Sequence, residues 1–139
     1  MGAFVVDTSV ALKWFLDDEE DREYSLTILR SISDDYKPVV PWLWFYEMGN
    51  ALTVAVRRKR IAFEQGEEFL QLIEQMPIDI DPPDRAVVLR LPYLARQYSL
   101  TTYDAAYLEL ASRLQLPLAT GDQALVRAAA DAKLGLLVI

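Results

Sequence analysis

The sequence predicts an α/β fold built on a parallel β-sheet. Short apolar runs of strand length alternate with helical patterns along the chain, which is typical of parallel strands joined by helices. The chain has 139 residues, 53% of them hydrophobic, which is enough to bury one sizeable core. Because no linker, repeat or low-complexity tract divides it, we expect a single domain over residues 1–139.

Apolar runs with the length of buried strands occur along the whole chain. The first run stops at Asp7, where a helix opens at Thr8 and Ser9. The second lies between prolines, and the third alternates isoleucine with aspartate. In chain order, the predicted strands cover residues 3–6, 38–41, 78–81, 116–120 and 136–139.

Apolar residues recur at helical spacing between these strands. Beyond the helix that opens at Asp7, we expect helices over residues 20–32, 42–59, 63–76, 84–98, 101–114 and 122–132. The acidic run 17–21 is expected to be a solvated helix start. Pro92 should kink or split its helix, because proline lacks the backbone N–H of a helix interior. In the helix over 63–76, the side chains expected to pack inward are Phe69, Leu70, Leu72 and Ile73.

The composition limits the chemistry that the chain can perform. It has no Cys and no His, so catalysis would depend on carboxylates, hydroxyls, amines or a metal held by oxygen. The net charge of -7 argues against a broad nucleic-acid-binding surface but not against local basic patches. No apolar run approaches the roughly 18 residues of a membrane span, and the N-terminus lacks the pattern of a signal peptide. We therefore expect a cytoplasmic protein with no membrane partner.

Four acidic residues stand out by their positions. Asp7 and Asp122 each follow a predicted strand, and ligand sites in parallel sheets form beyond the carboxyl ends of strands. If those two strands are neighbours, their acids converge at one edge. Glu47 is the only charge in a strongly apolar half-helix, with Asn50 on the same face. Asp104 lies at the start of a helix rich in Ala and Leu.

Each acid also has a purely structural interpretation. Asp7 and Asp122 are suited to cap helices, and Asp104 could close a capping box with Thr101. Glu47 could form a salt bridge or tilt toward solvent.

Taken together, the acids favour a functional interpretation. If they meet, repulsion raises their proton affinities, and only a bound cation removes that penalty without protonation. Ligation by oxygen alone suits Mg²⁺ or Mn²⁺. The hydroxyl and amide groups that would orient such ligands belong to Thr8, Ser9, Thr120 and Asn50.

A basic run ends the helix over 42–59 and is a candidate for binding phosphate groups. On an ideal helix, Arg58 falls within roughly 20° of Glu47 and about 16 Å further along the axis. The alternative is that these cations only stabilise the negative end of the helix. The candidate residues are Arg57, Arg58, Lys59 and Arg60, with Lys13 as a weaker one.

Four blocks of sequence, each holding one of the acids, occur in order along the chain. The blocks are VVDTSVALKW (5–14), YEMGNAL (46–52), TYDAAYLELA (102–111) and LATGDQAL (118–125). In these residues the chain resembles the PIN-domain ribonucleases, most closely the VapC toxins of toxin–antitoxin pairs. The absence of His and Cys fits this resemblance.

The resemblance implies a PIN-like three-layer sandwich with a parallel sheet of four to five strands flanked by helices. It implies Mg²⁺-dependent endonucleolytic cleavage of RNA, a VapB-like antitoxin whose tail occupies the site, and a homodimer. Asp7, Glu47, Asp104 and Asp122 would be the catalytic and metal-binding acids. Thr8 or Ser9 and Thr120 would match the family's hydroxyl positions, and Asn50 its supporting amide.

Two other hypotheses belong to different classes. The first is a catalytically silent PIN-like module that binds RNA or protein, although such a module need not tolerate the repulsion among four acids. The second is an α/β phosphatase or phosphoacceptor. The segment from Asp7 to Ser9 lacks the second aspartate expected for a phosphatase, and no lysine obviously completes a receiver site.

Overall fold

The computed structural model describes residues 2–137. Within this range the helices and strands follow the order β1 (Gly2–Val6), α1 (Thr8–Phe15), α2 (Arg22–Ser31), β2 (Tyr36–Pro41), α3 (Trp42–Arg57), α4 (Phe63–Gln75), β3 (Asp79–Asp81), α5 (Arg85–Tyr98), α6 (Thr102–Leu114), β4 (Leu118–Ala119) and α7 (Gln123–Asp131).

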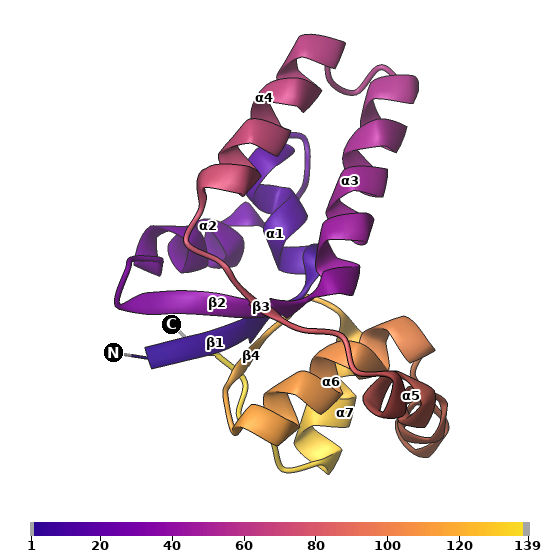
Figure 1. Cartoon of the computed structure of the whole chain (residues 1–139). Coiled ribbons are helices and arrows are strands. Elements are labelled where there is room, and N and C mark those ends of the chain that lie inside the picture. The colour runs from indigo at the N-terminus through magenta and orange to yellow at the C-terminus, as the bar shows by residue number, and fades with distance from the viewer. Residues whose placement is uncertain (1, 138–139) are drawn as a thin grey trace.

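The four strands β1 to β4 form one parallel sheet in the order β3-β2-β1-β4. Val5 of β1 pairs with Val39 of β2 on one side and with Leu118 of β4 on the other. The helices α1 and α2 lie on one side of the sheet, and α5, α6 and α7 lie on the other (Figure 1). The predicted α/β fold, with a parallel sheet between two helical layers, is therefore confirmed.

The apolar core lies on both faces of the central strand. Phe4, Val5 and Val6 of β1 are completely buried, together with Trp44 of α3 and Leu108 of α6. Burial on both faces explains why β1 is a continuous apolar run instead of an alternating one. The core thereby fixes the end of β1, and with it the position of Asp7.

The prediction for the inward face of α4 is wrong in part. Ile73 is buried and Phe69 packs against Phe15 of α1, but Leu70 and Leu72 are exposed. The physical reason is that α3 and α4 form an antiparallel pair that extends away from the sheet (Figure 1). Over much of its length α4 therefore has few neighbours, and only one stripe of its surface is covered.

Two other local predictions need correction, and the structure describes only part of a third. Pro92 does not split its helix, because α5 continues from Arg85 to Tyr98. The acidic run 17–21 precedes α2 instead of starting it, and Asp21 adopts a left-handed backbone conformation. At the C-terminus, Leu136 makes an isolated parallel bridge with Leu118, and the rest of the predicted strand at 138–139 lies outside the described residues.

Candidate active site

The sheet brings two of the predicted acids to one edge. Val6 at the end of β1 pairs with Ala119 at the end of β4, and the backbone N–H of Asp7 donates to the carbonyl of Ala119 at 3.1 Å. Asp7 directly follows β1, and Asp122 follows β4 after a two-residue turn. The expectation that these strands are neighbours, with their acids at the same carboxyl edge, is confirmed.

Asp7 is held by hydrogen bonds to both of its carboxylate oxygens. Oδ1 accepts from the Ser9 hydroxyl at 2.6 Å and from the Val10 N–H at 3.2 Å. Oδ2 accepts from the Thr120 hydroxyl at 2.5 Å. The same two hydroxyls accept from the backbone after β4, Ser9 from the N–H of Gly121 and Thr120 from that of Asp122. Asp7 is thus the centre of a hydrogen-bond network, here called the clamp, in which Ser9, Thr120 and the N–H groups of Gly121 and Asp122 join the ends of β1 and β4.

Burial makes Asp7 an unusually weak acid. Asp7 is only 4% exposed, and the resulting desolvation raises the pKa of its carboxyl group from 3.8 to about 6. The bonds from Ser9, Thr120 and Val10 oppose this rise, whereas the charge of Asp122 adds to it. A carboxylate in such a position is stabilised by any cation that approaches it.

Glu47 and Asp104 extend the acidic group from two different helices. Glu47 is half-buried on α3, and its Oε1 accepts from the hydroxyl of Tyr107 on α6 at 2.5 Å. Burial raises the pKa of Glu47, the Tyr107 bond lowers it, and the charge of Asp104 raises it further. Burial also raises the pKa of Asp104, which the Thr101 side chain lowers and the charge of Asp122 raises.

These pairwise effects link the four acids in one electrostatic group. Asp122 acts on Asp7 and on Asp104, and Asp104 acts on Glu47. However, no three carboxylates within residues 2–137 lie close enough to hold an ion as they stand. The described residues therefore do not gather the four acids into one group that could hold an ion, and the four-acid metal site stays a prediction.

The capping interpretation is also correct for part of the group. Asp7 caps α1 through Val10, and Asp122 caps α7 by accepting from the Leu125 N–H at 3.1 Å. At α6 the cap is Thr101, whose hydroxyl accepts from the Asp104 N–H at 3.0 Å. Capping fixes the backbone positions of these acids and does not remove their mutual repulsion.

The donor set fits a hard divalent cation. All four acids offer oxygen, and none of them takes part in the ion pairs formed within the described chain. The recorded hydrogen bonds occupy one oxygen of Glu47 and one of Asp122, leaving Oε2 and Oδ2 without a donor among residues 2–137. Oxygen-only donors of high charge are the ligands that Mg²⁺ and Mn²⁺ prefer.

The predicted supporting residues divide into two sets. Ser9 and Thr120 contact Asp7 directly. Thr8 is half-buried at the start of α1, and Asn50 is exposed on α3 one turn beyond Glu47.

The predicted RNA-binding cations lie further from the acids. Arg57, Arg58 and Lys59 are exposed at the far end of α3. Lys13 makes a long 3.5 Å contact with the Asp21 carbonyl. Arg60 binds Asp18 at 2.9 and 2.7 Å and Glu19 at 3.2 Å, so the acidic run occupies it within the chain.

Sequence reasoning did not single out Tyr107. It is 1% exposed, and its hydroxyl contacts Glu47 across the gap between α6 and α3. One signal was available, because Tyr107 follows Asp104 by three residues and so lies on a neighbouring part of the same helix face. The partner on α3 could not be inferred from that spacing.

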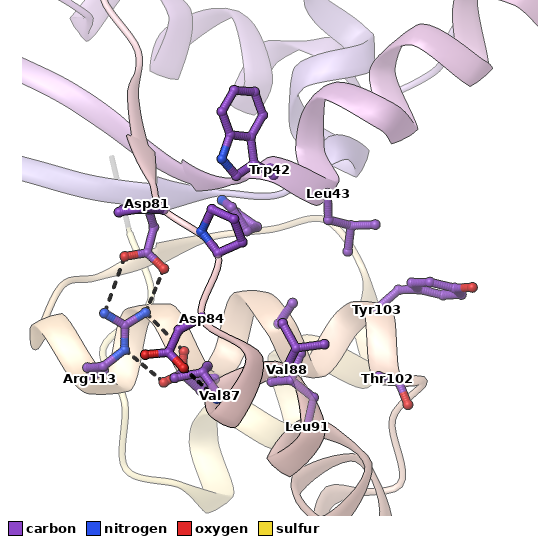
Figure 2. Close-up of a pocket in the computed structure, with 15 residues that line it drawn as sticks. Trp42, Leu43, Asp81, Asp84, Val87, Val88, Leu91, Thr102, Tyr103 and Arg113 are labelled. Atoms are coloured by element: carbon purple, nitrogen blue, oxygen red, sulfur yellow. Dashed lines mark hydrogen bonds and ion pairs between the residues drawn. The ribbon is translucent and has the colours of Figure 1, made fainter.

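An apolar groove of about 480 Å³ lies beside the first turns of α3 and α6, the helices that hold Glu47 and Asp104. Figure 2 shows Leu43 of α3 facing Val88 and Leu91 of α5, with Tyr103 of α6 at one side and the ring of Trp42 directed away from α5. Much of this lining is exposed, including Trp42, Val88 and Tyr103. The groove is therefore an apolar surface feature next to the acidic group.

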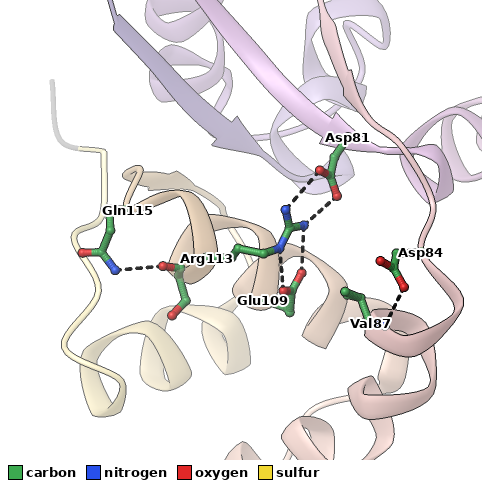
Figure 3. A network of polar contacts seen from close by, with 7 residues as sticks. Asp81, Asp84, Val87, Glu109, Arg113 and Gln115 are labelled. Carbon is green, nitrogen blue, oxygen red and sulfur yellow. Dashed lines mark hydrogen bonds and ion pairs between the residues drawn. The ribbon is translucent and has the colours of Figure 1, made fainter.

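The opposite end of the groove is polar. Arg113 of α6 donates to both oxygens of Asp81, at 3.3 and 2.7 Å, and to both oxygens of Glu109, at 3.1 and 2.9 Å (Figure 3). These bonds connect α6 to the end of β3, just before the chain enters α5. Asp84 caps α5 by accepting from the Ala86 N–H at 2.8 Å. The groove thus has an apolar middle and an acidic rim.

A parallel sheet between helices, with Asp7 and Asp122 at its carboxyl edge and with Glu47 and Asp104 on two nearby helices, defines an α/β protein with an acidic centre. Comparison with known proteins identifies the family. A family model described as PIN domain matches residues 4–131. Ribonuclease VapC1 of Mycobacterium tuberculosis, from strains CDC 1551 / Oshkosh and H37Rv, is 33% identical over 104 residues, covering 75% of this chain and 77% of that protein. The chain therefore belongs to the PIN domain family, as its resemblance predicted.

Solved structures agree with this assignment. PAE2754 from Pyrobaculum aerophilum is 25% identical, with a TM-score of 0.63 over 91% of this chain and 79% of that one. A toxin–antitoxin complex from Klebsiella pneumoniae (17% identity, TM-score 0.60, 86% of both chains) shares the fold. So does FitAcB from Neisseria gonorrhoeae (14% identity, TM-score 0.64, 97% of this chain and 96% of that one).

The raised pKa of Asp7 predicts a pH-dependent stability for the metal-free protein. Between about pH 4 and pH 6 the folded chain binds more protons than the unfolded chain, so the unfolding free energy falls as pH rises. The pKa change from 3.8 to about 6 corresponds to about 3 kcal/mol. Asp7→Asn cannot titrate, so urea denaturation at pH 4 and pH 7 should show a correspondingly smaller fall. The exposed control Asp131→Asn should keep the wild-type fall; equal falls in wild type and Asp7→Asn would contradict the assignment.

Proposed function

We propose that the chain is a Mg²⁺-dependent endoribonuclease, the toxin of a VapBC-type toxin–antitoxin system, which hydrolyses RNA phosphodiester bonds in the cytoplasm. The observation that carries the proposal is the electrostatic group formed by Asp7, Glu47, Asp104 and Asp122 at the carboxyl edge of the sheet. The 33% identity to Ribonuclease VapC1 supports RNA as the substrate. Mn²⁺ is expected to replace Mg²⁺, because both prefer oxygen ligands.

The four acids would hold one or two ions, which supply charge neutralisation and a more acidic water for attack on the phosphate. Asp7 is the most rigid of the four, since Ser9, Val10 and Thr120 fix its two oxygens. Glu47 and Asp122 each keep an oxygen that has no hydrogen-bond donor among the described residues. Either acid is placed to orient a water molecule as well as to ligate.

Exposed basic side chains at the end of α3 would guide the RNA to the four acids. Arg57, Arg58 and Lys59 are exposed at the end of α3, and Arg58 lies about 16 Å along the helix axis from Glu47. Arg60 would have to leave Asp18 and Glu19 to join them. We therefore assign the phosphate contacts first to the three exposed residues.

An antitoxin is the proposed protein partner. One solved structure with this fold is described as a toxin–antitoxin complex, and the resemblance to VapC toxins implies a VapB-like partner whose tail covers the acidic site. Such a segment would need basic or polar groups to face the four carboxylates.

A second copy of the chain is the proposed occupant of the apolar groove. The groove is lined by apolar side chains that are themselves exposed, namely Trp42, Val88 and Tyr103. It also carries both signs of charge, with Asp81, Glu109 and Arg113 at the rim. A two-fold interface needs such self-complementarity, because each patch meets its own copy.

Cleavage of RNA tests the enzymatic proposal. Wild type with Mg²⁺ or Mn²⁺ should cut single-stranded RNA at internal positions, and EDTA should abolish the cutting. Asp7→Asn should lower the rate by at least about a hundredfold while the circular dichroism spectrum stays unchanged. Cutting that persists in EDTA would contradict the metal mechanism. RNA binding without cutting under any of these conditions would support the silent binding module instead.

Light scattering after gel filtration tests the dimer. Wild type should elute with twice the mass of one chain, and Val88→Asp should shift it to the monomer by placing a charge in the groove. Leu70→Asp is the matched control. Leu70 and Val88 are both 48% exposed, but Leu70 lies on α4, outside the groove. A monomeric wild type, or a dimer that only Leu70→Asp disrupts, would contradict this interface.

A further inference from the structure

The contact between Tyr107 and Glu47 joins two helices at the acidic group. Glu47 belongs to α3 and Tyr107 to α6, sixty residues later, and their oxygens are 2.5 Å apart. The hydroxyl donates and the carboxylate accepts. Tyr107 is 1% exposed, so the donor of this hydrogen bond is buried, whereas the acceptor residue, Glu47, is only half-buried.

Glu47 differs from Asp7 and Asp122 in how it is held. Those two acids precede helices and accept from backbone N–H groups of the first turn. Glu47 lies inside α3, where the backbone N–H groups are already used by the helix. Among the described residues, the Tyr107 hydroxyl is the donor recorded for its carboxylate.

The direction of this hydrogen bond follows from the chemistry of its two groups. A carboxylate has no hydrogen to donate, so the Tyr107 hydroxyl donates to Oε1 of Glu47. Removal of that hydroxyl would leave the flexible Glu47 side chain without the donor that holds it among the described residues.

We propose that Tyr107 is a positioning residue for Glu47, whose Oε1 it fixes so that Oε2 is presented to a divalent cation. This inference rests on the proposed function, because it assumes that Glu47 ligates an ion. It assigns Tyr107 a role beyond core packing. Removal of a group that orients a ligand typically weakens metal binding about ten- to a hundredfold.

The test is Mg²⁺ binding to RNA-free protein, measured by titration calorimetry and by the rise in melting temperature. Tyr107→Phe keeps the buried ring and removes only the hydroxyl, so we expect the dissociation constant for Mg²⁺ to rise about ten- to a hundredfold. Tyr24→Phe is the matched control, because the Tyr24 hydroxyl donates at 2.6 Å to the Leu137 carbonyl and not to an acid. The control should bind Mg²⁺ as wild type does.

A double-mutant cycle separates positioning from packing. If Tyr107 acts through Glu47, adding Tyr107→Phe to Glu47→Gln should cause no further loss of Mg²⁺ affinity. Losses that multiply, or a Tyr107→Phe variant with wild-type affinity, would overturn the inference. If Tyr107→Phe fails to fold, Glu47→Asp provides the second test, since it keeps the charge but withdraws the carboxylate from the hydroxyl. Its affinity should fall by a similar factor, and wild-type affinity would overturn the inference.

The outcome for wild type distinguishes the two proposals. Wild type that binds Mg²⁺ alongside an unaffected Tyr107→Phe variant would refute only the role of Tyr107. Wild type that shows neither Mg²⁺ binding nor RNA cleavage would refute the proposed function, and the positioning role with it.

Discussion

The parallel pairing of β1 with β4 is the constraint on which the site depends. It places the chain leaving each strand at the same edge of the sheet, where Asp7 and Thr120 meet in a buried hydrogen bond. Ser9 and the N–H of Asp122 extend this contact into a clamp. The core around β1 makes the position rigid, and the same burial gives Asp7 its raised pKa. The burial of Asp7 therefore explains both its fixed position and its raised pKa.

Structural and functional roles coexist in these acids. Asp7 and Asp122 cap helices, which orders the backbone that positions them, and a cap alone would not require the two acids to lie at the same edge of the sheet. The repulsion between Asp122 and both Asp7 and Asp104 is a cost that capping does not offset. A divalent cation would remove that cost, which supports the proposal that these acids bind an ion.

The sequence predicted the fold and the acidic edge because both follow from local rules. An apolar run that ends in Asp7, and another followed by Asp122, are sufficient to place two carboxylates once the strands are adjacent. The errors arose where tertiary context decides. Leu70 and Leu72 are exposed because α4 extends beyond the sheet.

The long-range contacts could not be predicted from local sequence rules either. Arg60 lies 42 residues from Asp18, and Tyr107 lies 60 residues from Glu47, so helical periodicity could not pair them.

The most direct test of the account is the anomalous diffraction of a crystal grown with Mn²⁺. We expect a peak about 2.1 Å from a carboxylate oxygen of Asp7 and from at least one of the other three acids. A saturated crystal with no peak there, and with Asp7 bound only by Ser9, Val10 and Thr120, would contradict it.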